Sequence, residues 1–212
     1  MAAVSEKAKA GYRELLQLRR KGKSAEPIPN RYPWHGEMAI RELLEFARSA
    51  QQQGHPADIR ILTGSAPDRV YGCEDRSVWD QFAKAGGRIR IIVWGDNPGK
   101  CGGVLRALYE TNESVEFRLS GTNELAGQLM HFVVVGNSAY RLEAPHTPFP
   151  DDTIFQDFSP EIPARICFND PIGGEAMVRC FDSMWGLSRP LNRVVPGTIG
   201  SPATAVSTNA RG

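Results

Sequence analysis

The stretch MHFVVVGNSAYRLE, residues 130–143, decides the fold of this chain of 212 residues. Two runs of β-forming residues, 132–135 and 139–142, flank the turn-forming residues 136–138. Short apolar runs separated by a turn that contains glycine are typical of a β-hairpin. We therefore predict a hairpin here, with His131 at its mouth.

The sequence on both sides of the hairpin alternates between helix and strand patterns. Apolar residues three and four positions apart predict helices at about 37–50, 79–83, 104–109 and 171–187. Runs rich in β-forming residues predict strands at 58–63, 88–94, 115–119 and 164–168. Such alternation implies an α/β fold in which helices flank a central mixed sheet. Ile91 and Val134 should then be buried in that sheet.

This order of elements over residues 37–188 resembles one lobe of the phospholipase D-like superfamily. The family motif is His-x-Lys, four residues, Asp, and then Gly-Ser-x-Asn, on two adjacent strands. Its histidine attacks phosphorus, its lysine and asparagine hold the phosphate oxygens, and a second histidine protonates the leaving group. The resemblance implies a single phospholipase D-like lobe, whereas active members assemble two lobes by duplication or homodimerisation. We leave open whether this chain is a monomer or a homodimer.

The family motif does not line up with the hairpin in either register. Matching the apolar run before the turn places Gly136 at the Asp position, His131 at the lysine position and Leu129 at the nucleophile position. Taking His131 as the nucleophile instead places Val133 at the lysine position and Ser138 at the Asp position. Both registers lack the lysine.

The second half of the motif is also absent. A segment that contains Arg141 and Glu143 stands in place of Gly-Ser-x-Asn. A phosphate site without these donors loses several kcal/mol of transition-state stabilisation, on the order of that measured for an oxyanion-hole donor. We therefore expect a non-catalytic protein, a pseudo-enzyme. The alternative is a divergent phosphodiesterase or nuclease that uses His131 in a homodimer, with Glu143 or His146 as a helper.

Composition excludes several classes of protein. The formal net charge is +1, so no global basic field favours nucleic acid. The four cysteines have no CxxC spacing, and no metal-ligand spacing stands out, so we expect neither a metal nor a cofactor. No apolar run approaches the roughly 18 residues of a membrane span, and the N-terminus lacks the apolar core of a signal peptide. The chain is expected to be cytoplasmic, without membrane insertion.

Residues 1–23 are predicted to form a basic amphipathic helix. They contain seven Lys and Arg residues against two Glu, and Ala8, Tyr12, Leu15 and Leu16 share one helical face. The helix either packs on the domain by this face or contacts an acidic partner, nucleic acid or a membrane surface. The candidate contact residues are Arg13, Arg19 and Arg20. Residues 24–36 are proline-rich and are predicted to form a stiff connector.

The segment 145–160, PHTPFPDDTIFQDFSP, combines prolines with aromatic and acidic residues. Its rings are too apolar for an ordinary solvated loop, so they either fold over the core or bind a partner. The candidate partner-binding residues are Phe149, Asp151, Asp152, Phe155, Asp157 and Phe158. Residues 189–212 carry prolines and small polar residues without periodicity, and are predicted to be a flexible, disordered tail.

We interpret the chain as a regulatory or inhibitory interaction protein with a protein partner. In size and composition it also resembles plasmid-borne fertility-inhibition proteins, which block conjugation by acting on the coupling ATPase of the DNA-transfer machinery. That resemblance implies a conjugation ATPase as the partner. A third hypothesis is a nucleic-acid-binding module that uses the basic N-terminal helix.

Overall fold

The predicted alternation of strands and helices is present in the computed structural model, which describes residues 5–55, 57–64, 68–71, 77–95, 103–121, 128–146 and 163–192. The strands are β1 (Ile28–Pro29), β2 (Ile59–Thr63), β3 (Ile89–Trp94), β4 (Val115–Ser120), β5 (His131–Val135), β6 (Ala139–Glu143), β7 (Ala164–Cys167) and β8 (Arg189–Pro190). The helices are α1 (Glu6–Lys21), α2 (Pro33–Gln52), α3 (Asp68–Tyr71), α4 (Ser77–Lys84), α5 (Gly103–Thr111) and α6 (Pro171–Leu187).

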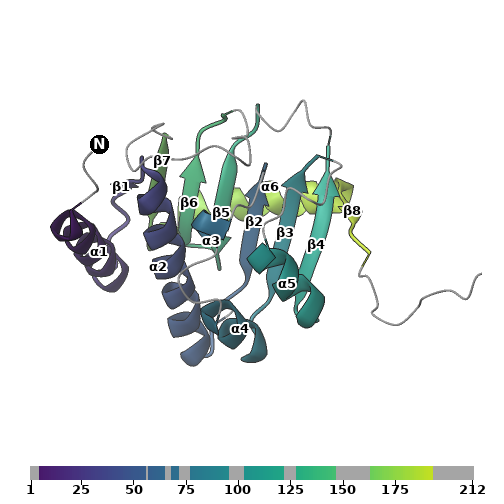
Figure 1. Cartoon of the computed structure of the whole chain (residues 1–212), viewed down its shortest axis with the longest axis horizontal. Helices are drawn as coiled ribbons and strands as arrows, with labels where there is room; N and C mark the ends of the chain where they lie inside the picture. The colour runs from purple at the N-terminus through teal and green to yellow at the C-terminus, as the bar shows by residue number, and fades with distance from the viewer. Residues whose placement is uncertain are drawn as a thin grey trace, which may run out of the picture.

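Within the described residues, the strands all belong to one mixed sheet of eight strands, in the order β1-β7-β6-β5-β2-β3-β4-β8 (Figure 1). β2, β3 and β4 are parallel, and every other pairing in the sheet is antiparallel. The predicted hairpin is β5–β6, which lies near the centre of the sheet and joins the parallel half to the antiparallel half. The predicted α/β fold with a central mixed sheet is confirmed.

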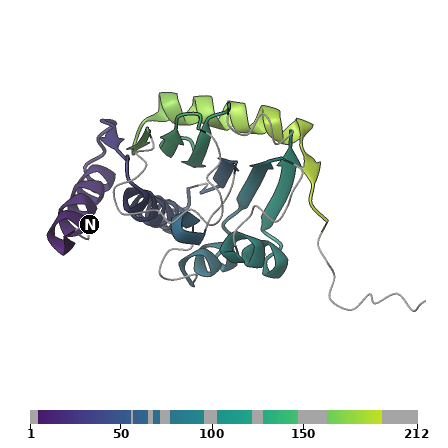
Figure 2. The same ribbon diagram turned by 45° about the horizontal axis from the view of Figure 1, so that its top comes forward.

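Helices cover both faces of the sheet (Figure 2). α6 lies along one face, and α2, α4 and α5 lie on the other. Because side chains alternate between the two faces of a strand, β5 contributes to both cores. Val133 packs on the α2 side and Val134 on the α6 side. Ile91 and Val134 are both 0% exposed, which confirms their predicted burial.

Two helix starts carry local signals that the sequence provides. α6 begins at Pro171 after the cap residue Asp170, whose carboxylate accepts a hydrogen bond from the backbone N–H of Gly173; a capping carboxylate followed by proline is a common start of a helix. α2 begins with Pro33 in its first turn, four residues before the predicted start near 37. The predicted connector at 24–36 therefore includes the first turn of α2.

The short elements β1, β8 and α3 were not predicted. β1 lies inside the predicted connector and pairs with β7, while β8 uses two residues of the predicted tail and pairs with β4. Strands of two residues carry no alternating pattern, and each of these contains a proline, which favours turns and edges in sequence reading. Leu191 and Asn192 of the predicted tail are also described, and residues 193–212 lie outside the described part of the chain.

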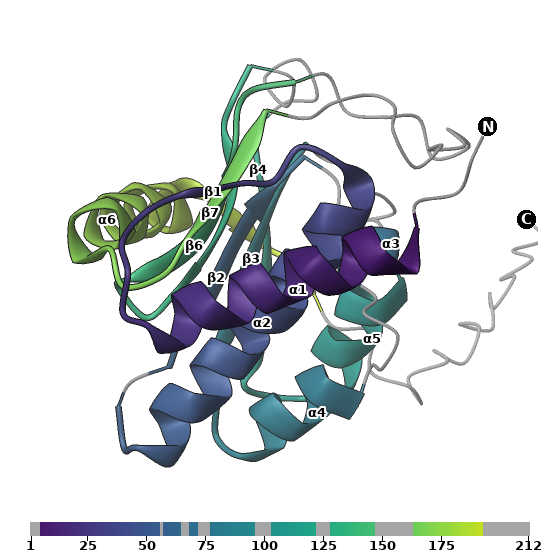
Figure 3. The same ribbon diagram turned by 90° about the vertical axis from the view of Figure 1, so that its left-hand side faces the viewer.

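The basic helix α1 packs across α2 (Figure 3). Leu16 is fully buried there, and the Arg20 guanidinium pairs with Glu42 of α2 at 2.9 Å. Ala8 and Leu15 are exposed, so the predicted apolar face was partly wrong. The face that packs is formed instead by Tyr12, which is partly buried, and Leu16, which is buried one turn further along the helix.

Among the helices that the structure describes, none combines the length and the apolar character needed to cross a membrane.

Candidate functional site

The β5–β6 hairpin brings His131 and Glu143 face to face. Val135 pairs with Ala139 across a three-residue turn, and that register places His131 directly opposite Glu143 at the mouth of the hairpin. Side chains directly opposite each other in an antiparallel pair lie about 4.5–5.5 Å apart at Cβ, close enough for direct contact. Both side chains lie on the α2 side of the sheet. His131 is two residues from Val133 and Glu143 is two residues from Arg141, and both Val133 and Arg141 face α2.

His146 joins this pair from the segment that follows β6. Nδ1 of His131 lies 3.4 Å from Oε2 of Glu143, and Nε2 of His146 lies 3.3 Å from the same oxygen. The two imidazole rings meet edge to face, with centroids 4.7 Å apart. We refer to His131, Glu143 and His146 as the His–Glu–His cluster. Their side chains are 5%, 11% and 19% exposed, respectively, so the cluster is accessible mainly beside His146.

Arg141 links this cluster to the N-terminal part of the chain. Its Nη1 donates to Oε1 of Glu143, and its Nε donates to Oδ1 of Asn30 at 2.5 Å. Asn30 in turn donates from Nδ2 to the hydroxyl of Tyr12 at 2.8 Å. A continuous chain of polar contacts therefore runs from α1 to the mouth of the hairpin.

Electrostatics keep Glu143 ionised in this environment. Burial alone raises the pKa of a carboxyl, but the Arg141 guanidinium and the hydrogen bonds from His131 and His146 hold the pKa of Glu143 well below its ordinary value. Burial, with a smaller contribution from the charge of Arg141, lowers the pKa of His35 to about 4. His35 stacks on Tyr12 with ring centroids 3.8 Å apart, so α1 and the start of α2 are in direct contact beside Arg141.

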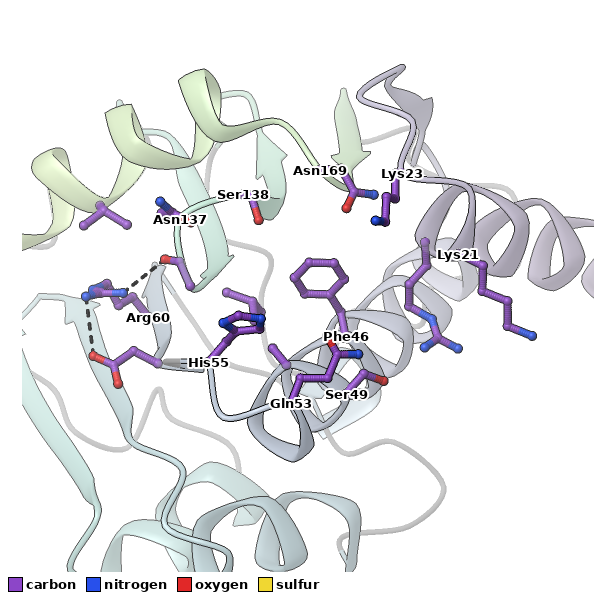
Figure 4. Close-up of a pocket in the computed structure, with 16 residues that line it drawn as sticks. Lys21, Lys23, Phe46, Ser49, Gln53, His55, Arg60, Asn137, Ser138 and Asn169 are labelled. Carbon is purple, nitrogen blue, oxygen red and sulfur yellow. Dashed lines mark hydrogen bonds and ion pairs between the residues drawn. The ribbon is translucent and has the colours of Figure 1, made fainter.

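A second site lies at the opposite end of the hairpin, where a pocket of about 750 Å³ opens between α1, α2 and the β5–β6 turn (Figure 4). We call it the basic pocket; its polar lining includes Lys21, Lys23, Ser49, Gln53, His55, Arg60, Asn137, Ser138 and Asn169. Lys23 and Asn169 have positive φ angles of 53° and 57°. The Nδ2 atom of Asn169 is buried and has no hydrogen-bond partner among the described residues. Arg60 forms ion pairs with Asp58 and Asp182, two carboxylates that it shares with Arg90.

The structure brings together the three residues named for the alternative enzyme, His131, Glu143 and His146. It does not describe the predicted partner-binding residues of the loop, Phe149, Asp151, Asp152, Phe155, Asp157 and Phe158, which lie outside the described ranges. Their role stays a prediction.

The predicted basic contact residues of α1 have different surroundings. Arg19 pairs with Glu26 at 2.5 Å and Arg20 pairs with Glu42, so both charges are engaged within the chain. Arg13 is exposed beside a small groove at the N-terminal end of α2. Less free charge is therefore available for an acidic partner than the sequence suggested.

Comparisons with solved structures identify the fold. The chain is similar to Nuc, a phospholipase D family member from Salmonella typhimurium, with a TM-score of 0.51 and 18% identity over 80% of this chain and 100% of Nuc. It is also similar to NucT from Helicobacter pylori, with a TM-score of 0.52 and 12% identity over 78% of this chain and 99% of NucT. No family model and no curated protein sequence matches the chain. The fold is that of a single phospholipase D-like lobe.

Sequence reasoning named the members of the cluster but missed their mutual arrangement and the role of Asn30. One signal was present: the turn at 136–138 fixes the register, and that register alone places residue 131 opposite residue 143. Asn30 offered no such signal, because it contacts Arg141 only after β1 has joined the edge of the sheet.

Proposed function

We propose that this chain is a non-catalytic interaction protein built on a phospholipase D-like lobe. The observation that carries the proposal is the Glu143 carboxylate, which is buried, ionised and paired with Arg141. In the register that places His131 at the family's lysine position, this carboxylate lies directly across the hairpin from the residue expected to hold phosphate oxygens. A fixed negative charge at that position repels a phosphodiester and its transition state.

The positive groups that a phosphate would need are already committed. Arg141 donates to one oxygen of Glu143, and the two histidines approach the other oxygen. The carboxylate thus satisfies the local cation and donors in place of a bound anion. A substrate phosphate would have to displace it, which would leave a buried carboxylate without its partners at a cost of several kcal/mol, about 3–5 by analogy with broken buried ion pairs.

The test is a direct assay for phosphodiesterase activity. Purified protein should not hydrolyse bis(p-nitrophenyl) phosphate, phospholipid or DNA above the level of a His131→Ala control. Metal-independent turnover that disappears in His131→Ala would overturn the proposal.

That same result would establish the second candidate, a divergent phosphodiesterase. One observation favours it: both histidines approach a single carboxylate oxygen, an arrangement that suits proton transfer between an acid and a base. In that case His131 would act as the nucleophile and Glu143 or His146 as its helper, with a homodimer completing the site.

For the interaction surface, we propose the segment at 145–160 together with the groove at its base. An apolar groove of about 500 Å³ is lined by described residues that precede and follow this segment in the sequence, such as Ala144 and Pro163. Its lining includes Pro27, Pro29, Met130, Leu142, Pro145 and Pro163. Met130 is 47% exposed, as an apolar anchor beside a docking surface would be.

Replacing Phe155 and Phe158 with alanine should abolish the biological effect and leave the thermal midpoint nearly unchanged. A large fall in the thermal midpoint would instead make these rings part of the core. Full biological activity with unchanged stability would remove the segment from both roles.

The partner class that we propose is the coupling ATPase of conjugative DNA transfer, acting in the cytoplasm of a donor cell. Its support is the resemblance of the whole chain, in size and composition, to fertility-inhibition proteins. Expression in a donor strain should reduce the frequency of plasmid transfer, and the ATPase should copurify with the protein. Normal transfer with every conjugation system tried would argue for a different partner.

A further inference from the structure

The donor atoms of the His–Glu–His cluster have the spacing of metal ligands. Oε2 of Glu143 lies 3.4 Å from Nδ1 of His131 and 3.3 Å from Nε2 of His146. In a tetrahedral zinc site, metal–nitrogen and metal–oxygen bonds of about 2.0–2.2 Å place neighbouring ligand atoms roughly 3.3–3.5 Å apart. Two of the three distances between donor atoms therefore already match those of a tetrahedral zinc site.

The third distance, between the ligand nitrogens of His131 and His146, needs only a small change. All three donor atoms lie within 4.8 Å of one another, so the histidine nitrogens must approach by at most roughly 1.5 Å to complete a tetrahedral face. His146 belongs to the segment after β6 rather than to a strand, and it is the most exposed of the three. It can make this movement without disturbing the β5–β6 pairing.

The carboxylate is oriented so that one oxygen remains for a metal. Arg141 donates to Oε1 of Glu143 and is itself held by its hydrogen bond to Oδ1 of Asn30, whereas both histidines contact the other oxygen, Oε2. Outer contacts of this kind fix the orientation of a ligating carboxylate, and their loss typically costs about 10–100-fold in metal affinity. Oε2 faces both imidazoles and is suited to monodentate coordination.

The donor set selects a class of metal. Two imidazoles and one carboxylate suit zinc and its first-row neighbours, whereas magnesium and calcium prefer sites made only of oxygen ligands. Glu143 helps to line the apolar groove, and His146 is the most exposed member of the cluster, so an ion and a fourth ligand would approach beside these two residues.

We propose that His131, Glu143 and His146 bind a divalent transition metal, of which Zn²⁺ is the best match, with a fourth position open to water or to a donor from a partner. This site goes beyond the proposed interaction function, because it depends only on the cluster and would exist with any partner. Since a bound cation would offset the charge of Glu143, the repulsion of a phosphodiester by that charge applies to the metal-free protein.

The experiment uses the full chain, without a polyhistidine tag, after removal of metal with a chelator. Zn²⁺ is titrated in competition with a chromophoric chelator, and the stoichiometry is checked by elemental analysis. We expect one Zn²⁺ per chain and a loss of affinity of at least about tenfold in His146→Ala, the variant least able to disturb folding because this ligand is the most exposed. The matched control is His55→Ala, which removes a histidine from the basic pocket at the other end of the hairpin and should bind Zn²⁺ like the wild type.

Circular dichroism and thermal melting establish that each variant is folded. Co²⁺ substitution provides an independent readout, because visible absorption bands of four-coordinate Co²⁺ should form in the wild type and in His55→Ala but not in His146→Ala. Absence of Zn²⁺ binding by folded wild-type protein would overturn the proposal. Equal affinity in His146→Ala, or a loss confined to His55→Ala, would also overturn it.

Discussion

The two ends of the β5–β6 hairpin satisfy their polar groups in opposite ways. At the mouth, Glu143 and Arg141 are buried and bound to each other, and the polar contacts continue to Asn30. At the turn, the basic pocket leaves Lys21 and Lys23 exposed, and the buried amide of Asn169 has no partner in the described structure. Charge that is neutralised within the chain contributes to stability, whereas charge left in solvent is available to a ligand. The two ends should therefore respond very differently to substitution.

The largest effect is expected at the mouth. Glu143→Gln removes the carboxylate and leaves the buried guanidinium of Arg141 without its counter-charge, so the free energy of unfolding should fall by about 3–5 kcal/mol in denaturant titrations. The matched control is Glu116→Gln, which breaks the exposed pair with Arg88 and should change stability by less than about 1 kcal/mol. Equal losses of stability in the two variants would show that the Glu143–Arg141 pair contributes no more to stability than an exposed ion pair.

A substitution at the centre of the sheet provides a reference for the size of these effects. Ile91 is fully buried between β2 and β4, and its truncation to alanine should cost about 2–5 kcal/mol through lost burial and a residual cavity. Chemical denaturation measures the loss. A cost below about 1 kcal/mol would mean that the core relaxes into the cavity left at residue 91. Ile91→Ala could then not serve as the reference for the loss of stability in Glu143→Gln.

A third, smaller effect concerns pH. Because the pKa of His35 is lowered to about 4 from an unfolded value near 6.5, the unfolded chain binds this proton more readily than the folded chain. The resulting stability is fully present above about pH 6.5 and is lost as the pH falls towards 4.

The variant His35→Phe keeps an aromatic ring against Tyr12 but cannot titrate, so its thermal midpoint should vary less over this pH range. A profile identical to the wild type would assign the pH dependence to other groups. The lowered pKa of Glu143 acts at lower pH: its contribution to stability is present above the ordinary carboxyl pKa of 4.5 and is lost as the pH falls from there through the folded value.

The smallest effect is expected at the turn end. Lys23 has a φ of 53°, a backbone conformation that costs an L-residue roughly 1 kcal/mol and glycine nothing sterically. Lys23→Gly should therefore leave stability unchanged or raise it by up to about 1 kcal/mol in thermal unfolding. Lys23→Ala removes the charge but keeps the strain, and should lie within about 0.5 kcal/mol of the wild type. A gain in Lys23→Ala equal to that in Lys23→Gly would assign the effect to charge.

The sheet and the covering helices were predictable because their signals are local. The run of β3, apolar except for Arg90, and the Asp170–Pro171 helix start each act through neighbours in the sequence. The edge strands were not predictable, since Ile28 and Pro29 become a strand only when β7 is present to pair with them. Whether β7 lies in position to pair depends on the tertiary structure, which the sequence of two residues cannot predict.

The composition of the candidate site was predictable, and the turn at 136–138 also carried the signal that pairs His131 with Glu143, but the rest of the arrangement was not predictable. His131 and Glu143 were named separately, and only the hairpin register shows that they are directly opposite each other. The link from Arg141 through Asn30 to Tyr12 joins residues that are far apart in the sequence, and it depends on how α1 packs. No pattern of spacing within one segment can predict such a contact.

The two-residue edge strands β1 and β8 also limit how copies of this protein can assemble. Each outer strand carries a proline, Pro29 on one side and Pro190 on the other, and proline has no N–H to offer a neighbouring strand. Short edges that contain proline resist edge-to-edge aggregation. A homodimer should therefore form through helices or loops rather than by extending the sheet across two subunits, and unpaired edge strands should not seed fibrils.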